Sequence, residues 1–281
     1  MDVRSALSQI IETVTRGEIV FPTSAELALK VQRAVDDPDS SIDQLAKLVQ
    51  ADPLLAARVV AIANSVAYNR SGRTIADVKM AVSRLGFKTL RSLATSIVVR
   101  QMEGMAKTPA ERQMAAQLWT HTAHVAALAH MIARRVTHID PESAFFAGIV
   151  HEVGSFFLIS RAGNHPGLLD GEPGSLEGWD GGEEGVLGRA VLQRLGVPDT
   201  ILIGIEGFWE GYLAMPPKSL ADTLLLADEL APVESPLSRL SGKGRAGMDA
   251  RIELAMDAET LSSILSESAT EVASLTAALQ S

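Results

Sequence analysis

The chain has 281 residues, of which 47% are hydrophobic, enough for one large core or two modest ones. It contains no cysteine, which excludes disulfide bonds, thiolate zinc sites, iron–sulfur clusters and a cysteine nucleophile. The formal net charge of −9 and an aromatic content of 4% disfavour nucleic-acid binding, which needs clustered cations and stacking rings. A protein or a small ligand is the expected partner.

The N-terminal segment gives an expectation for the compartment. MDVRSALSQ has no basic stretch followed by an apolar core, so it is not typical of a secretory signal. No uninterrupted apolar run reaches membrane-spanning length, and a membrane partner is therefore not expected. The absence of cysteine fits a reducing interior, and together these features predict a cytoplasmic protein.

Apolar residues recur at helical spacing throughout the first half, and turn residues separate the repeats. The predicted helices cover residues 2–16, 27–35, 42–49, 53–66, 78–85 and 87–102. Asp52-Pro53 is the strongest local signal, because Asp is a preferred N-cap and Pro a preferred first helical residue. Asn64 and the following turn could contact a partner, although a helix-terminating role is commoner. No alternating strand pattern occurs, so we predict a helical bundle.

A second capping signal, Thr108-Pro109 with Glu111, predicts the start of a long helix. The apolar stripe along this helix includes His121, and His124 lies one turn on, nearly on the same side. His130 falls on a different face, and we expect it to be exposed.

The stretch FFAGIVHEVGSFFLISR is apolar around an adjacent pair, His151-Glu152. Asp140-Pro141 repeats the capping signal and predicts a helix that carries this pair. An imidazole and a carboxylate in so apolar a setting need partners. They could ligate a divalent metal, or they could form a satisfied core pair, which is the commoner outcome.

The rest of the sequence predicts further helices, which are separated by one glycine-rich segment and one segment of small residues. The composition predicts a long solvated loop at residues 163–188 and a linker at residues 232–247. Helices are expected at 188–195, 199–209 and 219–230, the last of which carries Asp228. From Asp257 an amphipathic helix either docks on the protein's own bundle or serves a partner, and docking is favoured. We predict an N-terminal bundle at 1–105, a second helical lobe at 106–231, and a linker with a C-terminal helix at 232–281.

Several stretches resemble the HD-related output domain family, HDOD, over roughly residues 15–231. They are FPTSAELALKVQRAV, DPLLAARVVAIANSVAY, IADVKMAVSRLGFKTLRSL, LWTHTAHVA and FFAGIVHEVGSFFL. The resemblance implies an all-α protein whose N-terminal bundle packs against a lobe similar to the HD metal-dependent phosphohydrolases. It also implies a regulatory role in signal transduction, since the family resembles HD enzymes with degenerate active centres.

In HD enzymes a His, an adjacent His-Asp pair and a late Asp hold the metal. By this resemblance His121 matches the first position and His151 the second, Glu152 stands where Asp is expected, and Asp228 matches the last. Glu is longer than Asp by one methylene, which displaces the carboxylate and can weaken a site of fixed geometry. The four side chains could instead form a metal-free hydrogen-bonded cluster.

Two departures from the HD pattern argue against a two-metal phosphodiesterase. Ser155 stands where that branch has a Lys, and no histidine follows His165 to supply a second metal. No cofactor is therefore expected, although a single iron, manganese or zinc ion could bind. The leading hypothesis is a non-catalytic regulatory module that acts through protein–protein contacts.

Two rival functions need cationic side chains in particular places. A single-metal phosphohydrolase for a nucleotide or phosphodiester would need cations near the pair, and Arg161 and Arg134-Arg135 are the candidates. A nucleic-acid adaptor would need Arg84, Lys88 and Arg91 on one face, if the break at Gly86 preserves their phase; Arg100 is a further candidate.

Overall fold

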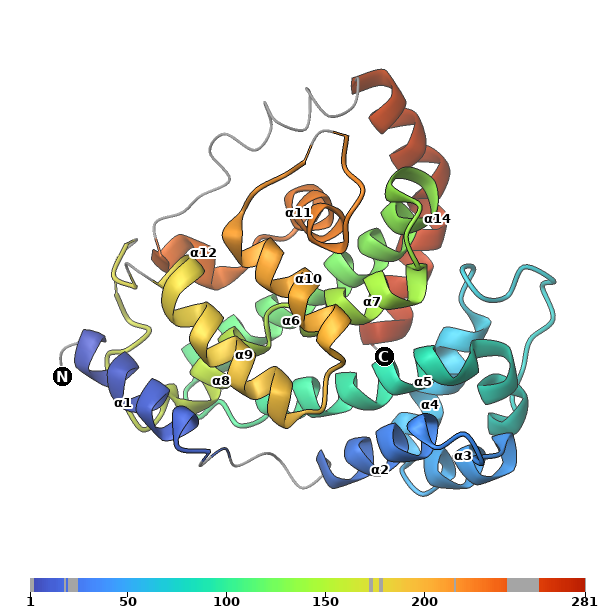
Figure 1. The fold of residues 1–281 in the computed structure, drawn as a ribbon, viewed down its shortest axis with the longest axis horizontal. Helices are drawn as coiled ribbons and strands as arrows, with labels where there is room; N and C mark the ends of the chain where they lie inside the picture. The colour runs from blue at the N-terminus through green and yellow to red at the C-terminus, as the bar shows by residue number, and fades with distance from the viewer. Residues whose placement is uncertain are drawn as a thin grey trace.

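The computed structural model describes residues 3–17, 19, 25–171, 174–176, 179–214, 216–241 and 258–280. Within these ranges the protein is all-α, as predicted, and contains no strand (Figure 1). The predicted division at residues 105 and 231 stays a prediction.

The described residues of the first half form five helices. They are α1 (Val3–Thr15), α2 (Ala25–Asp36), α3 (Ile42–Gln50), α4 (Pro53–Asn64) and α5 (Val78–Glu103). The Asp52 carboxylate accepts from the Leu55 amide at 2.9 Å, which confirms the predicted cap of α4. The FPTS stretch of the family resemblance lies outside the described residues.

The helix α5 is bent at Gly86, where the sequence predicts an interruption between two helices. Gly86 has φ +78°, a left-handed conformation that glycine adopts without steric cost. The second part of α5 is buried almost all round, and it packs against α2, α3 and α4. It therefore forms the centre of the N-terminal bundle.

The second half is built around α6, which is buried on nearly every side. Its elements are α6 (Pro109–Ile132), η1 (Ala133–Thr137), α7 (Pro141–Val150), α8 (Val153–Ala162), η2 (Trp179–Glu183), α9 (Glu184–Arg194), α10 (Asp199–Glu210), α11 (Leu220–Leu230), α12 (Pro236–Ser241) and α14 (Ala258–Gln280). The helix α6 packs on α7, α11 and α14 and lies in the middle of the molecule (Figure 1). The α6–α7 contact is close at Gly148, where a Cβ atom would stand 2.5 Å from the Cα atom of Ala126.

Two predicted irregular segments contain more structure than expected. The segment predicted as a solvated loop holds η2 and the first turn of α9, and Leu168, Leu176 and Trp179 on it are buried. In the predicted linker, Leu237 and Leu240 are buried on α12. Both predictions were wrong there because scattered apolar side chains among glycines and prolines pack on the second lobe. The rest of the predicted linker, 242–247, lies outside the described residues.

The helix α14 docks on the protein's own bundle, as favoured. It packs against α6 and α4, with Leu275 and Leu279 fully buried. The opposite edge of the molecule is formed by α1, which packs against α9 (Figure 1).

The stretch Pro141–Ala162 is long and apolar enough to cross a membrane by length and composition. In this protein 94% of that window is buried against other helices, as expected for the centre of a helical core.

Candidate metal centre

Three side chains from three helices converge in the second lobe: His121 from α6, His151 at the end of α7, and Asp228 from α11. One potential ligand atom from each lies within 4.8 Å of the others. The two Nε2 atoms are 3.4 Å apart, and the Asp228 Oδ1 atom is 3.1 Å from Nε2 of His121. The close packing of α6 on α7 brings the two rings together.

Both imidazole rings are oriented by backbone carbonyls on their other nitrogen. Nδ1–H of His121 donates to Val233 O at 2.8 Å, and Nδ1–H of His151 donates to Gly148 O at 2.8 Å. Because a carbonyl can only accept, we assign the proton to Nδ1 in each neutral ring. The Nε2 lone pairs therefore point toward Asp228 and toward each other, an orientation typical of metal-ligating histidines.

The helix predicted to carry His151-Glu152 is interrupted at this pair. The helix α7 ends at Val150 and α8 begins at Val153, with Glu152 at φ −100°, ψ 19° between them. In a continuous helix the Glu152 amide would donate to Gly148 O, the carbonyl that the His151 ring occupies. The prediction of one helix was wrong because this side chain competes with the backbone.

The two histidines differ in their pKa shifts. Burial disfavours a charged His121, but the hydrogen bond and charge of Asp228, with the charge of Glu152, outweigh it and raise the pKa of His121. Burial lowers the pKa of His151, and the nearby His121 adds to this effect against the opposing charge of Glu152. Without a metal, Asp228 therefore favours protonation of His121, whereas burial favours the neutral form of His151.

The donor set fits one divalent metal. Ligands at about 2.0–2.1 Å from a tetrahedral ion are separated by about 3.4 Å, close to the spacing of the two Nε2 atoms. Two imidazoles and a carboxylate suit zinc, iron and manganese. Both histidines are almost fully buried, whereas the Asp228 side chain is 32% exposed, so the cluster reaches solvent on the Asp228 side.

Neither Glu152, the predicted fourth ligand, nor His124, one turn after His121, contributes an atom to the converging group. Glu152 is 7% exposed, and its charge raises the pKa values of both histidines, but its oxygens lie outside the group. His124 binds the Thr120 carbonyl on its own helix at 2.8 Å. Three of the four predicted ligands therefore come together.

The charges that act on the two histidines come from Asp228, Glu152 and the histidines themselves. The arginines proposed as phosphate ligands have other contacts. Arg161 lies over the Phe157 ring at 4.7 Å, and Arg134 and Arg135 pair with glutamates of α14. The pKa shifts of the two histidines thus reflect nearby carboxylates and the histidines themselves.

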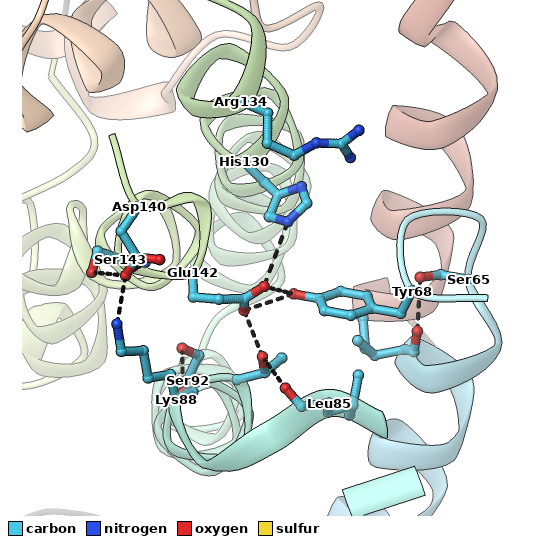
Figure 2. Close-up of polar contacts among 12 residues, drawn as sticks. Ser65, Tyr68, Leu85, Lys88, Ser92, His130, Arg134, Asp140, Glu142 and Ser143 are labelled. Atoms are coloured by element: carbon cyan, nitrogen blue, oxygen red, sulfur yellow. Dashed lines mark hydrogen bonds and ion pairs between the residues drawn. The ribbon is translucent and has the colours of Figure 1, made fainter. Parts of the chain in front are cut away.

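His130, predicted to be exposed, is 4% exposed and belongs to a second polar cluster. Figure 2 shows this cluster around Glu142, which accepts from Tyr68 Oη at 2.8 and 3.0 Å and from Thr89 Oγ1 at 2.5 Å. His130 Nε2 lies 3.6 Å from the same carboxylate. The prediction failed because α6 is central, so that even its second face is covered. The apolar residues on both sides of His130 in the sequence were the signal that indicated its burial.

The basic side chains proposed to bind nucleic acid make contacts with other residues of the protein. Arg84 donates to the carbonyls of Ala63 and Arg73, Lys88 pairs with Asp140 at 3.0 Å, and Arg91 pairs with Asp36. Asn64, the other candidate contact, exchanges two hydrogen bonds with the backbone of Ile75, at 2.7 and 2.8 Å. Arg84, Arg91 and Asn64 therefore make contacts within the N-terminal bundle, whereas Lys88 contacts the start of α7.

An all-helical fold with a His–His–Asp cluster on helices of the second lobe defines an HD-like protein. The HDOD domain family matches residues 21–171, which is more than half of the chain, and the chain belongs to this family. The resemblance that the sequence motifs suggest is thus confirmed.

Solved structures of similar fold include proteins from three bacteria. A candidate metal-dependent phosphohydrolase of Shewanella amazonensis is 22% identical with a TM-score of 0.72, and the match covers 99% of both chains. An HDOD domain protein of unknown function from Geobacter sulfurreducens is 24% identical with a TM-score of 0.63, over 99% and 98% of the two chains. A candidate signal transduction protein of Marinobacter aquaeolei is 21% identical with a TM-score of 0.62, over 99% of this chain and 66% of that one. At these identities the likeness shows the fold.

An uncharacterized protein of Treponema pallidum is 24% identical over 141 residues. The match covers 50% of this chain and 26% of that relative, so the chain spans about a quarter of the curated relative it matches.

Proposed function

We propose that this protein is a non-catalytic regulatory module of signal transduction that acts through protein–protein contacts. The observation that carries the proposal is that the arginines expected to hold a phosphate group make other contacts. An enzyme that hydrolyses phosphate esters stabilises the developing charge with cations. Here the charges of Asp228 and Glu152 act on His121, while Arg161 lies over a phenylalanine ring and Arg134 and Arg135 pair with glutamates of α14.

The cluster keeps a structural role in this proposal. His121, His151 and Asp228 would hold one divalent ion and so tie α6, α7 and α11 together. When bound, such an ion supplies Lewis-acid chemistry. The backbone carbonyls of Val233 and Gly148 keep the rings oriented with or without it. Among the proteins of similar fold, a candidate signal transduction protein agrees with a regulatory role, and a candidate metal-dependent phosphohydrolase agrees with the alternative below.

The alternative is a single-metal phosphohydrolase, favoured by the convergence of three donors and by the exposure of Asp228 to solvent. The two functions are separated by a hydrolysis assay on the whole protein with zinc, manganese or ferrous iron and bis-p-nitrophenyl phosphate. We expect the rate of the wild-type protein to equal that of His121→Ala and that of the metal alone. Metal-dependent turnover by the wild type that His121→Ala abolishes would establish the enzyme.

A further inference from the structure

The helix α14 lies across α6, η1 and the end of α4, and its contact side has a regular pattern. Glu267, Glu271, Leu275 and Leu279 follow one another at four-residue intervals, so they share one face of the helix. Leu275 and Leu279 are fully buried. The face is therefore acidic in its first half and aliphatic in its second.

The surface beneath α14 is complementary to this pattern. Arg134 of η1 pairs with Glu271 at 2.5 Å, and Arg135 pairs with Glu267 at 3.0 Å. The carboxylate of Glu271 also lies 3.7 Å from Nδ1 of His130. Two cations and a buried histidine thus face two carboxylates, and the leucines pack further along.

The fit of α14 is incomplete in its polar groups. Ser268 is fully buried and Thr276 is 5% exposed, and among the described residues neither hydroxyl has a hydrogen-bond partner. Burying an unpaired hydroxyl opposes docking. A helix with apolar residues at these two positions would avoid this cost and would compete with α14 for the same surface.

Resting on the regulatory function proposed above, we propose that the surface under α14 is the protein–protein interaction surface of this module. We name it the α14 seat: the end of α4 with Val66, the second half of α6, and η1. Its partner is an amphipathic helix with two carboxylates and two aliphatic residues at successive four-residue intervals. The helix α14 competes with this partner and keeps the seat covered.

A peptide of residues 258–280 labelled with fluorescein serves as the probe of the seat, added to the full-length chain. The double variant Glu267→Gln, Glu271→Gln weakens the chain's own α14 and leaves the seat intact. We expect this variant to bind the peptide at least tenfold more tightly than the wild type in fluorescence anisotropy. Adding Arg134→Gln and Arg135→Gln to it removes the complementary charges and should reverse the gain.

A reversible lock provides the matched control, because the chain has no cysteine of its own. The Val66 amide donates to Ser274 Oγ at 3.0 Å, which places the two residues side by side. Val66→Cys with Ser274→Cys should therefore staple α14 to α4 when oxidised. The oxidised protein should not bind the peptide, and reduction should restore wild-type binding.

Equal peptide binding by the wild type and the Glu267→Gln, Glu271→Gln variant would overturn the proposal, as would equal binding by the oxidised and reduced staple. So would binding that survives Leu275→Asp and Leu279→Asp in the peptide, since it would not use the aliphatic face. A doubled mass of the Gln variant by light scattering would assign the seat to a second copy of this chain and overturn the partner helix. None of these readouts uses the metal centre, so failure here is distinct from detection of phosphoester turnover.

Discussion

The protein buries two polar clusters on α6, less than three helical turns apart, and they are built differently. In the first, His121, His151 and Asp228 direct acceptor atoms toward one point, and the nearby charges are carboxylates. In the second, the Glu142 carboxylate is met by donors from Tyr68, Thr89 and His130. The first cluster therefore presents its acceptors to a cation, either a proton or a metal, whereas the carboxylate of the second already accepts from neighbouring hydroxyls. Burial of a histidine alone therefore does not indicate a metal ligand. A metal site is indicated when the neighbouring groups direct acceptor atoms, rather than donors, toward the same point.

The largest expected effect comes from changing the helix contact that assembles the first cluster. In Gly148→Ala the new Cβ would meet Ala126 Cα at 2.5 Å and N at 2.9 Å, both backbone atoms. Forcing α6 from α7 should lower the free energy of unfolding by about 3 kcal/mol or more, measured by urea denaturation. The matched control is Gly185→Ala, whose Cβ would meet Trp209 at 3.5 Å, an ordinary contact. A Gly148→Ala protein as stable as this control would contradict the close packing.

The second cluster should be sensitive to loss of its central acceptor. Glu142→Ala leaves the buried hydroxyls of Tyr68 and Thr89 without this partner and should cost about 2 kcal/mol in urea denaturation. Glu12→Ala, which removes an exposed carboxylate from a pair with Arg16, should change stability by less than about 0.5 kcal/mol. Similar values for the two variants would show that the hydrogen bonds of Glu142 do not stabilise the fold.

A smaller effect is expected from pH. Burial opposes ionisation of Glu142, but hydrogen bonds from His130, Thr89 and Tyr68 outweigh it and hold its pKa below the ordinary value of 4.5. The group therefore contributes stability above pH 4.5 that is lost as pH falls through the lowered pKa. Glu142→Gln should be less stable than the wild type by about 1 kcal/mol at pH 7, and the gap should close below pH 4.5. A gap independent of pH would refute this account of the charge.

Much of the fold could be predicted from sequence because its signals are local. The caps at Asp52, Thr108 and Asp140 bind their predicted amides, and Gly86 bends α5 where predicted. The convergence of the donors His121, His151 and Asp228 could be predicted because the family resemblance supplies long-range information that periodicity lacks.

The remaining features depend on contacts between distant parts of the chain. A helical wheel assigns His130 to a second face, but only the positions of α7 and α14 determine that this face is covered. The break at His151 results from a ring that points back to Gly148, which depends on a rotamer rather than on a propensity. The pairing of Arg134 and Arg135 with α14 joins residues more than 130 positions apart.

The most direct test of the difference between the clusters is the metal content of the purified full-length protein. It would be measured by elemental mass spectrometry after dialysis against a weak chelator, for wild type, His151→Ala and Glu142→Gln. We predict about one zinc, iron or manganese ion per chain in the wild type and in Glu142→Gln, and none in His151→Ala. A metal-free wild type, or metal retained by His151→Ala, would contradict the assignment of the His121–His151–Asp228 cluster as the cation site.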